Sequence, residues 1–356
     1  MTGKKKIASG LGQLMIPLIA LGVLVLFNLI RDPSFFVIRM AENNTGGKVL
    51  AGNLISVIDS ASALAIIAMG MTLVTAACGG QDISVGAVGA ISGAVFVKVV
   101  QGFGGITAGS FIVGLLVACL ATICFKLFNG TLVAVFKIQP MIATLILYSC
   151  GRSIAYWING DATPQLASPI LNAIGMTIPG IPIPTPIFCV AIVGLILFLV
   201  FRFTNIRLYT QSVGINQGAA RLNGINPVGV KLLSFALLGV CVTVAALIGI
   251  SRLGQLNHKT LLVDIEMDAI LAVAIGGNSL GGGKFRISGS ILGAYIIQML
   301  TTTLYAMSVS PVNVKAYKAI VIIIIVVAGS PVVKEKISSL WKKLRAGRIA
   351  ASKEVG

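Results

Sequence analysis

The chain has 356 residues, of which 56% are hydrophobic and only 10% are charged, and its mean hydropathy is +0.99. Soluble domains carry roughly 25% charged residues, so this composition excludes a soluble enzyme or binding module and indicates an integral membrane protein. The formal net charge of +17 requires no nucleic-acid partner, because an anionic lipid bilayer attracts the basic residues that flank membrane helices. We therefore expect an all-α polytopic membrane protein.

Apolar segments long enough to cross the membrane recur along the chain. A hydrocarbon core of about 30 Å takes about 20 apolar residues to cross. We expect ten spans, at residues 12–30, 61–79, 83–101, 106–125, 139–157, 186–203, 231–251, 267–282, 288–307 and 316–333. The third and the eighth are short or rich in glycine, which predicts broken helices. Residues 1–333 would then form the transmembrane domain, and residues 334–356 a basic cytoplasmic tail.

The basic N-terminus precedes an apolar run, as in a cleaved signal peptide. This run is close to 20 residues long and has no small-residue cleavage site after it, so it is predicted to remain as an anchor. Placing the N-terminus in the cytoplasm puts 18 of the 27 Lys and Arg residues inside, Lys126 and Lys231 among them, in agreement with the positive-inside rule. Ten spans then place both termini in the cytoplasm.

Ionisable residues that could power transport or perform chemistry are few. Glu266 and most of the aspartates fall at predicted outer helix ends or in loops, and His258 falls in a predicted external loop, where a solvated side chain is expected. Asp82 follows two glycines where a helix restarts near Ile83, which predicts a helix cap. A role in a translocation path is the alternative. We predict no catalytic or metal-binding residue.

The glycine-rich stretch at residues 276–290, GGNSLGGGKFRISGS, resembles a phosphate-binding loop only superficially. Phe285 stands where the P-loop needs Ser or Thr, and Asn278 stands where it needs Gly. The stretch instead predicts a helix end, a tight turn and the closely packed start of the next helix.

A short internal similarity links GAISGA at residues 89–94 with GSILGA at 289–294. Each contains a GxxxG pair suited to close helix packing, formed by Gly89 and Gly93 and by Gly289 and Gly293. The match indicates either a weak internal repeat or a chance alignment of common residues.

Two long loops could meet other proteins. The loop at 204–230 contains NQGAARLN, which favours a short helix closed by Gly224 and suits either a docking element or an ordinary connector. The loop at 161–186 is rich in proline, and it could meet an external protein or be a tolerant surface loop.

Four segments in order along the chain carry a family resemblance: GMTLVTAACGGQDISVGAV at 70–88, IQPMIATLIL at 138–147, VGINQGAARLNGI at 213–225 and MDAILAVAIGGNSLGGG at 267–283. They resemble the ribose, galactoside and xylose type permeases, the membrane subunits of bacterial ABC sugar importers. The resemblance runs from about residue 55 to 330 and implies a location in the bacterial inner membrane. It also implies a second permease copy or paralogue, an external sugar-binding protein and a cytoplasmic ABC ATPase. ATP and magnesium would bind the ATPase, and this chain would have no cofactor.

The resemblance also suggests functional residues. It assigns contact with the ATPase to Asn216, Ala219, Ala220, Arg221 and Gly224. For the translocation path we predict Gln81, Asp82, Gln139, Asn278 and Ser279, because polar side chains within a helix bundle are costly unless they meet one another, water or substrate. Hydrogen bonds between helices explain these five equally well.

Other functions are compatible with the same composition. A secondary transporter or channel would work without an ATPase partner. An ABC permease for branched-chain amino acids or nucleosides is a closer rival. A membrane-bound enzyme is least favoured, because the sequence has no recognisable reactive cluster.

Overall fold

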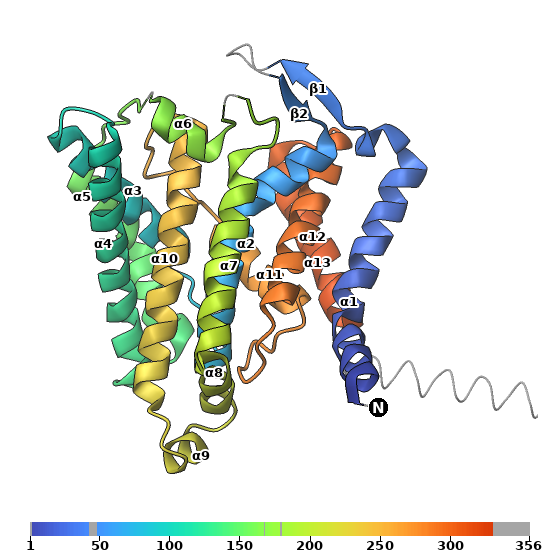
Figure 1. The fold of residues 1–356 in the computed structure, drawn as a ribbon, viewed down its shortest axis with the longest axis vertical. Coiled ribbons are helices and arrows are strands. Elements are labelled where there is room, and N and C mark those ends of the chain that lie inside the picture. The colour runs from blue at the N-terminus through green and yellow to red at the C-terminus, as the bar shows by residue number, and fades with distance from the viewer. Residues whose placement is uncertain (1, 43–47, 167, 179, 330–356) are drawn as a thin grey trace, which may run out of the picture. The chain divides into compact units, whose positions relative to one another are not determined.

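A computed structural model describes residues 2–42, 48–166, 168–178 and 180–329. The chain divides into two compact units, Met1–Thr303 and a second that begins at Leu304. The elements run, in chain order (Figure 1): α1 Thr2–Arg31, η1 Pro33–Phe36, β1 Arg39–Glu42, β2 Lys48–Ala51, α2 Asn53–Cys78, α3 Val85–Gly102, α4 Ala108–Ala134, α5 Pro140–Asn159, α6 Pro169–Gly175, α7 Thr185–Phe203, α8 Ile206–Ile215, α9 Gln217–Leu222, α10 Pro227–Leu253, α11 Ile265–Ile275, α12 Ile287–Ala306 and α13 Pro311–Gly329.

The helical architecture confirms the predicted fold class. Among the described residues, seven helices are long and apolar enough to cross a membrane, namely α2, α3, α4, α5, α7, α10 and α12. α1 contributes a shorter apolar stretch, Pro17–Arg31, and α13 covers most of the tenth predicted span. The predicted basic tail at 334–356 lies outside the described residues.

The eighth predicted span, 267–282, is interrupted, as its glycine content led us to expect, whereas the third, 83–101, corresponds to the continuous helix α3. α11 has 11 residues and ends at Ile275, which is too short to cross a membrane. The backbone turns at Gly277, whose φ of 80° is in the left-handed region that glycine tolerates. Residues 276–286 form the predicted turn, and α12 follows it.

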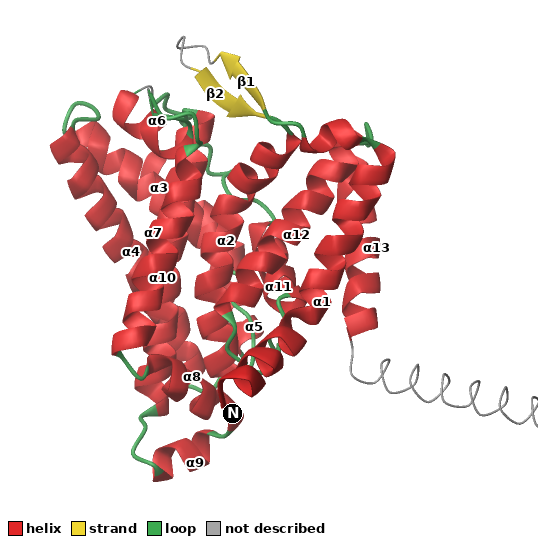
Figure 2. Cartoon of the chain, turned by 45° about the vertical axis from the view of Figure 1, so that its right-hand side comes forward, coloured by secondary structure: helices red, strands yellow, loops and turns green. Residues whose placement is uncertain are grey.

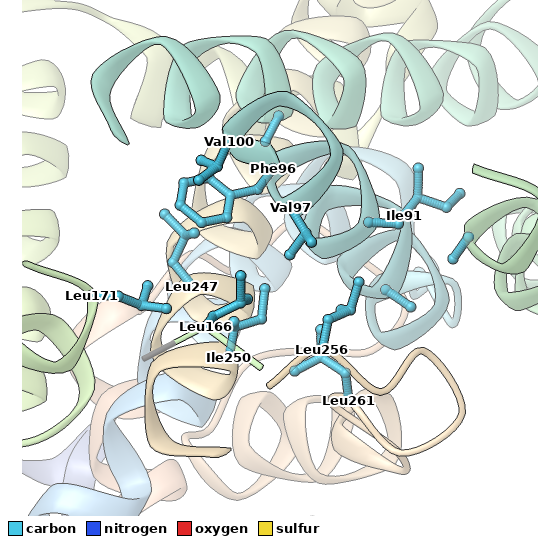
Figure 3. Close-up of a cluster of buried hydrophobic side chains, with 14 residues drawn as sticks. Ile91, Phe96, Val97, Val100, Leu166, Leu171, Leu247, Ile250, Leu256 and Leu261 are labelled. Carbon is cyan, nitrogen blue, oxygen red and sulfur yellow. The ribbon is translucent and has the colours of Figure 1, made fainter. Parts of the chain in front are cut away.

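The centre of the first unit is built on α2, whose apolar window is 94% buried. α10 packs against both α2 and α4, and α3 packs against α4 and α5. Figure 3 shows one core cluster, in which Phe96 and Ile91 of α3 meet Leu247 and Ile250 of α10 and Leu261 of the following loop. α2 and α10 are therefore inner helices, whereas α7, with 22% of its window buried, is peripheral.

Short polar residues begin and end several helices. Thr107 and Ser110 form a reciprocal capping box at the start of α4, which satisfies amides that the first turn leaves free. Asn226 accepts hydrogen bonds from two amides at the start of α10, and Gly254 ends that helix in the left-handed conformation.

The first unit also contains two features that we did not predict from the sequence. β1 and β2 pair as an antiparallel hairpin (Figure 2), and α6 lies within the predicted proline-rich loop. The turn-forming Asn and Gly residues between the strands were a usable hairpin signal. In α6, the amide of Gly175 donates to Ser251 Oγ on α10 at 2.8 Å, so part of this loop is anchored.

Candidate translocation and coupling site

Two glycine-rich segments meet at the end of α2. Gly79 ends α2 in the left-handed conformation, and a Cβ added there would lie 2.9 Å from the carbonyl oxygen of Gly281. Gln81 Nε2 donates to the carbonyl oxygen of Leu280 at 2.9 Å. The structure therefore joins residues 79–84 to the α11–α12 loop, and it brings four of the five predicted path residues onto adjoining segments.

Asn278 connects that loop to two helices. Its Oδ1 accepts from the Arg286 amide at 2.7 Å, and its Nδ2 donates to Ser290 Oγ at 2.9 Å. Ser290 Oγ shares a 2.6 Å hydrogen bond with Thr72 Oγ1 of α2. The Asn278 amide thus fixes the conformation of the loop and ties it to α2 and α12, while the neighbouring Ser279 is half-buried.

Asp82 lies in a buried polar cluster where α3 begins. Its Oδ2 is 2.8 Å from Lys126 Nζ, and both side chains are 0% exposed. Its Oδ1 accepts from the amide and the hydroxyl of Ser84 at 2.8 and 2.6 Å, and Asn129 Nδ2 donates to Ser84 Oγ at 2.9 Å. Asp82 is not the predicted N-cap residue, because Ser84 occupies that position and α3 begins at Val85, but Asp82 does accept a hydrogen bond from the Ser84 amide.

The structure corrects the surroundings that we predicted for Lys126 and Lys231. We assigned Lys126 and Lys231 to cytoplasmic segments, but Lys126 lies inside α4 with no exposed surface and Lys231 is 6% exposed in α10. The reason is that α4 continues to Ala134, well beyond the predicted end of its span at residue 125. A lone lysine and a lone aspartate in neighbouring apolar segments were a usable signal, because a charge buried in a membrane protein requires a partner.

Gln139 lies beside the same region, at the start of α5. It is exposed and is the N-cap residue of α5, although its side chain makes no capping hydrogen bond. The adjacent Pro140 ring packs on Gly80, where an added Cβ would lie 2.8 Å from Pro140 Cγ. The start of α5 is therefore in close contact with the segment that carries Gln81.

The predicted docking helix in the 204–230 loop is present as α9. Asn216 caps it, because Asn216 Oδ1 accepts from the amide of Ala219 at 3.0 Å. Gly224 follows it with a φ of 76°, which confirms the predicted helix end. Ala220 is buried, whereas Leu222 is 92% exposed. A second helix, α8, precedes α9 and was not predicted.

α8 meets the end of α2 and the α11–α12 loop with close backbone contacts at Gly214, beside side-chain contacts made by Ile206 and Ile215. A Cβ added to Gly214 of α8 would overlap the carbonyl oxygen of Ala76. That same oxygen accepts from the Gly283 amide at 3.0 Å, and a Cβ at Gly282 would lie 3.0 Å from Gly79 Cα. We call this contact the glycine junction: residues 76–79, Gly214 and residues 282–283.

Gly89 and Gly93 lie in the second and third turns of α3, Gly289 and Gly293 lie in the first two turns of α12, and both pairs pack closely. On α3, a Cβ at Gly89 would lie 2.7 Å from Leu262 Cδ1, and Gly93 also faces leucine side chains. On α12, Gly289 and Gly293 meet the backbone of α11 instead, whose carbonyl oxygens would overlap an added Cβ. The two pairs therefore pack against different kinds of surface.

Glu266 and His258 are corrections to the predicted loops. Glu266 is 2% exposed, and its Oε2, which has no hydrogen-bond partner among the described residues, lies over Gly86, where an added Cβ would overlap it. His258 is 3% exposed rather than solvated, and its carbonyl oxygen accepts from Arg152 Nη1 at 2.6 Å. The reason is that α5 and the start of α3 cover the loop before α11. These segments are far from that loop in the sequence, so the sequence does not show that they cover it.

The described residues thus combine membrane-length apolar helices, an apolar helix that ends early at Ile275 and a buried polar cluster. Residues 53–328 match the family described as branched-chain amino acid transport system / permease component, and the chain belongs to that family. It is therefore a multi-pass inner-membrane permease component.

Particular relatives in the family are sugar permeases. The chain is 35% identical to the galactofuranose transporter permease protein YtfT of Escherichia coli K12 over 92% of both chains. It is 36% identical to the fructose import permease protein FruF of Bifidobacterium longum, over 86% of this chain and 84% of the relative. It is 32% identical to the E. coli K12 ribose import permease protein RbsC, over 87% and 91%. No solved structure shows a significant match.

Proposed function

We propose that this chain is the membrane subunit of an ATP-driven importer that carries a monosaccharide. The support is that the relatives named above are permeases for galactofuranose, fructose and ribose, and that they match this chain over most of its length. ATP and magnesium bind a partner ATPase in this proposal, and this chain carries no cofactor of its own.

The observation that carries the proposal is the glycine junction. It connects the exposed α8–α9 segment directly to the α2 end and to the loop that holds Asn278. A displacement of α8 would be passed on at Gly214, because backbone contacts backbone there and no side chain at that position can yield. Closure of an ATPase on α9 would therefore move the α11–α12 loop and the segment that carries Gln81.

If the ATPase binds α9, the sides of the membrane and the other partners follow. Both termini and α9 face the cytoplasm, and the loop at 161–186, at the opposite end of the first unit from α9 (Figure 1), meets an external sugar-binding protein. A second copy or a paralogue completes the transporter. Gln81, Gln139, Asn278 and Ser279 border the sugar path, while Asp82 holds the start of α3 through its ion pair with Lys126.

Replacing Leu222 by Asp tests the coupling. Leu222 is 92% exposed, so the change leaves the fold intact but puts a charge on the surface that docks the ATPase. The complex is purified from its native membranes, and recovery of the ATPase and sugar-stimulated ATP hydrolysis are measured. We expect the Leu222→Asp chain to lose the ATPase, whereas the control Phe103→Asp, at a position that is 62% exposed in another loop, retains it.

Recovery of the ATPase with both variants would overturn the coupling assignment. Uptake by vesicles that contain only this chain, driven by an ion gradient without ATP, would overturn the importer and favour a secondary transporter. The solute class is tested separately, with the complete complex and its binding protein in vesicles. ATP-dependent uptake of a labelled amino acid or nucleoside, but of no pentose or hexose, would contradict the sugar assignment.

A further inference from the structure

A groove on the first unit is bordered by α7 and by the residues that lead into α12. Its volume is about 720 Å³. The wall from α7 includes Val190, Leu197 and Phe198, and the opposite wall includes Ile287 and Ile291. These side chains are apolar along the length of the groove, so it suits a hydrocarbon chain rather than a hydrated solute.

One end of the same groove carries three guanidinium groups, from Arg202, Arg207 and Arg286. Arg202 is in the last turn of α7, and Arg207 is in the first turn of α8, so both lie where α7 passes into α8 (Figure 1). Arg202 and Arg207 are exposed. The apolar and the cationic parts of the groove are therefore segregated along its length.

The protein supplies little negative charge to this region. The sequence contains no Asp or Glu from residue 162 to 263 or from 269 to 334, so none of the segments that line the groove carries an acidic residue. Among the described residues, neither Arg202 nor Arg207 forms an ion pair. Two neighbouring arginines without acidic partners repel one another, and an anion from outside the chain relieves that repulsion.

We propose that this groove binds one anionic phospholipid, with an acyl chain along the α7 wall and the phosphate on the arginines. Charge complementarity selects the headgroup, because arginine pairs with phosphate through two parallel hydrogen bonds. Basic pockets between membrane helices bind anionic headgroups in this way. A free phosphate would use only the cationic end, and an apolar helix from another protein would leave Arg202 and Arg207 without a counter-charge.

The bound lipid would act on the candidate translocation site through Arg286. The backbone amide of Arg286 donates to Asn278 Oδ1 at 2.7 Å, and its carbonyl oxygen accepts from Asn278 Nδ2 at 3.1 Å. At the base of the groove, Phe285 packs edge-on against Phe201 of α7, with ring centroids 5.2 Å apart. A headgroup on Arg286 would therefore hold the α11–α12 loop against the end of α7.

The test measures lipid binding, so its result is independent of the transported solute. The full chain is reconstituted in nanodiscs of phosphatidylcholine with increasing phosphatidylglycerol, and retained lipid and the thermal unfolding midpoint are measured. We expect phosphatidylglycerol to be retained and to raise the midpoint. In Arg202→Gln/Arg207→Gln we expect about 30-fold weaker retention, from about tenfold or less for each arginine near an anionic surface.

Two further variants separate the parts of the site. Gly194 lines the groove and an added Cβ there meets only the Met69 sulfur, at 3.8 Å, so Gly194→Leu should fill the groove and reduce retention without changing charge. Arg31→Gln/Arg39→Gln removes two arginines elsewhere and should retain the lipid as the unchanged chain does.

Three results would overturn the proposal. Equal retention of phosphatidylcholine would show that the charge is not recognised. The same rise in the unfolding midpoint from inorganic phosphate in phosphatidylcholine nanodiscs would show a free anion site. Loss of self-association in Gly194→Leu, with phosphatidylglycerol retained, would show that a second copy of the chain occupies the groove.

Discussion

Two ion pairs in the first unit have the same length and opposite surroundings. The Asp82–Lys126 and the Asp161–Lys259 pairs are each separated by 2.8 Å, yet the first is 0% exposed at both side chains and the second is more than 60% exposed at both. Exposed pairs contribute little because water solvates each charge almost as well as its partner does. Two buried ions depend on each other, because no water is present to solvate either charge if its partner is removed. Distance alone therefore says little about the importance of an ion pair in this protein.

A third pair lies between these limits. Arg252 and Asp59 are also 2.8 Å apart, with side chains about one-quarter exposed, and the guanidinium also donates to the Asp59 carbonyl oxygen. The three pairs share the same N–O distance and form a series of increasing exposure, and single substitutions can test whether stability follows that grading.

The largest effect is expected for Lys126→Met. It leaves the Asp82 carboxylate buried without its cation, which typically costs about 3–5 kcal/mol. We expect a large fall in the thermal unfolding midpoint in nanodiscs and a poor yield of folded chain. Asp82→Asn/Lys126→Met removes both charges and keeps an acceptor for the Ser84 amide, so it should recover much of the loss. A double variant no better than Lys126→Met would show that packing, rather than charge, dominates here.

A smaller effect is expected for Arg252→Met. The pair is partly solvated, so its loss is expected to cost about 1 kcal/mol and to lower the unfolding midpoint by a few degrees at most. The measurement is the same thermal unfolding curve at low and at high salt, because partial screening should shrink the difference between the two chains. A loss as large as that for Lys126→Met would break the proposed grading.

The smallest effect is expected for Lys259→Met, which should leave the unfolding midpoint unchanged. The hydrogen bond and charge of Lys259 lower the pKa of Asp161, and Asp161 raises the pKa of Lys259. The lowered pKa of Asp161 gives a contribution to stability that is present above the ordinary aspartate pKa of about 3.9 and disappears as the pH falls below it. The raised pKa of Lys259 gives a contribution to stability that is present below about pH 10 and disappears above it.

Water screens both of these exposed charges, so the two contributions are expected to be too small to detect. The unfolding midpoints of Lys259→Met and the unchanged chain should therefore coincide at every pH. Comparing the two chains at pH 3, 7 and 10.5 measures this directly. A clear loss of stability at pH 7 alone would mean that the loop pair is shielded from water in the membrane-bound protein.

The sequence analysis succeeded where a signal is local. Most apolar spans were predicted within a few residues because a helix across a bilayer needs a long run of apolar side chains, whatever its neighbours are. The end of α9 at Gly224 and the turn in residues 276–286 were also predictable, since glycine favours the left-handed conformation that ends a helix.

It failed where two distant segments decide the outcome. Lys126 was assigned to a cytoplasmic segment because its partner Asp82 lies 44 positions earlier in the chain, and the pairing depends on how α4 packs. The burial of His258, predicted in a solvated loop, and of Glu266, predicted at an outer helix end or loop, was missed for the same reason, because their covering segments come from α3 and α5. The hairpin of β1 and β2 was missed although its turn residues were visible.

The sequence by itself determined that the chain is a helical membrane protein with a family resemblance to sugar permeases, because hydropathy and motifs are properties of contiguous residues. Only the tertiary structure decided which polar groups satisfy one another, since a side chain buried in an apolar bundle takes its partner from whichever helix packs beside it. The glycine junction shows this most clearly. Gly79, Gly214 and Gly283 are each unremarkable alone, and their absence of side chains matters because the fold brings three backbones into contact.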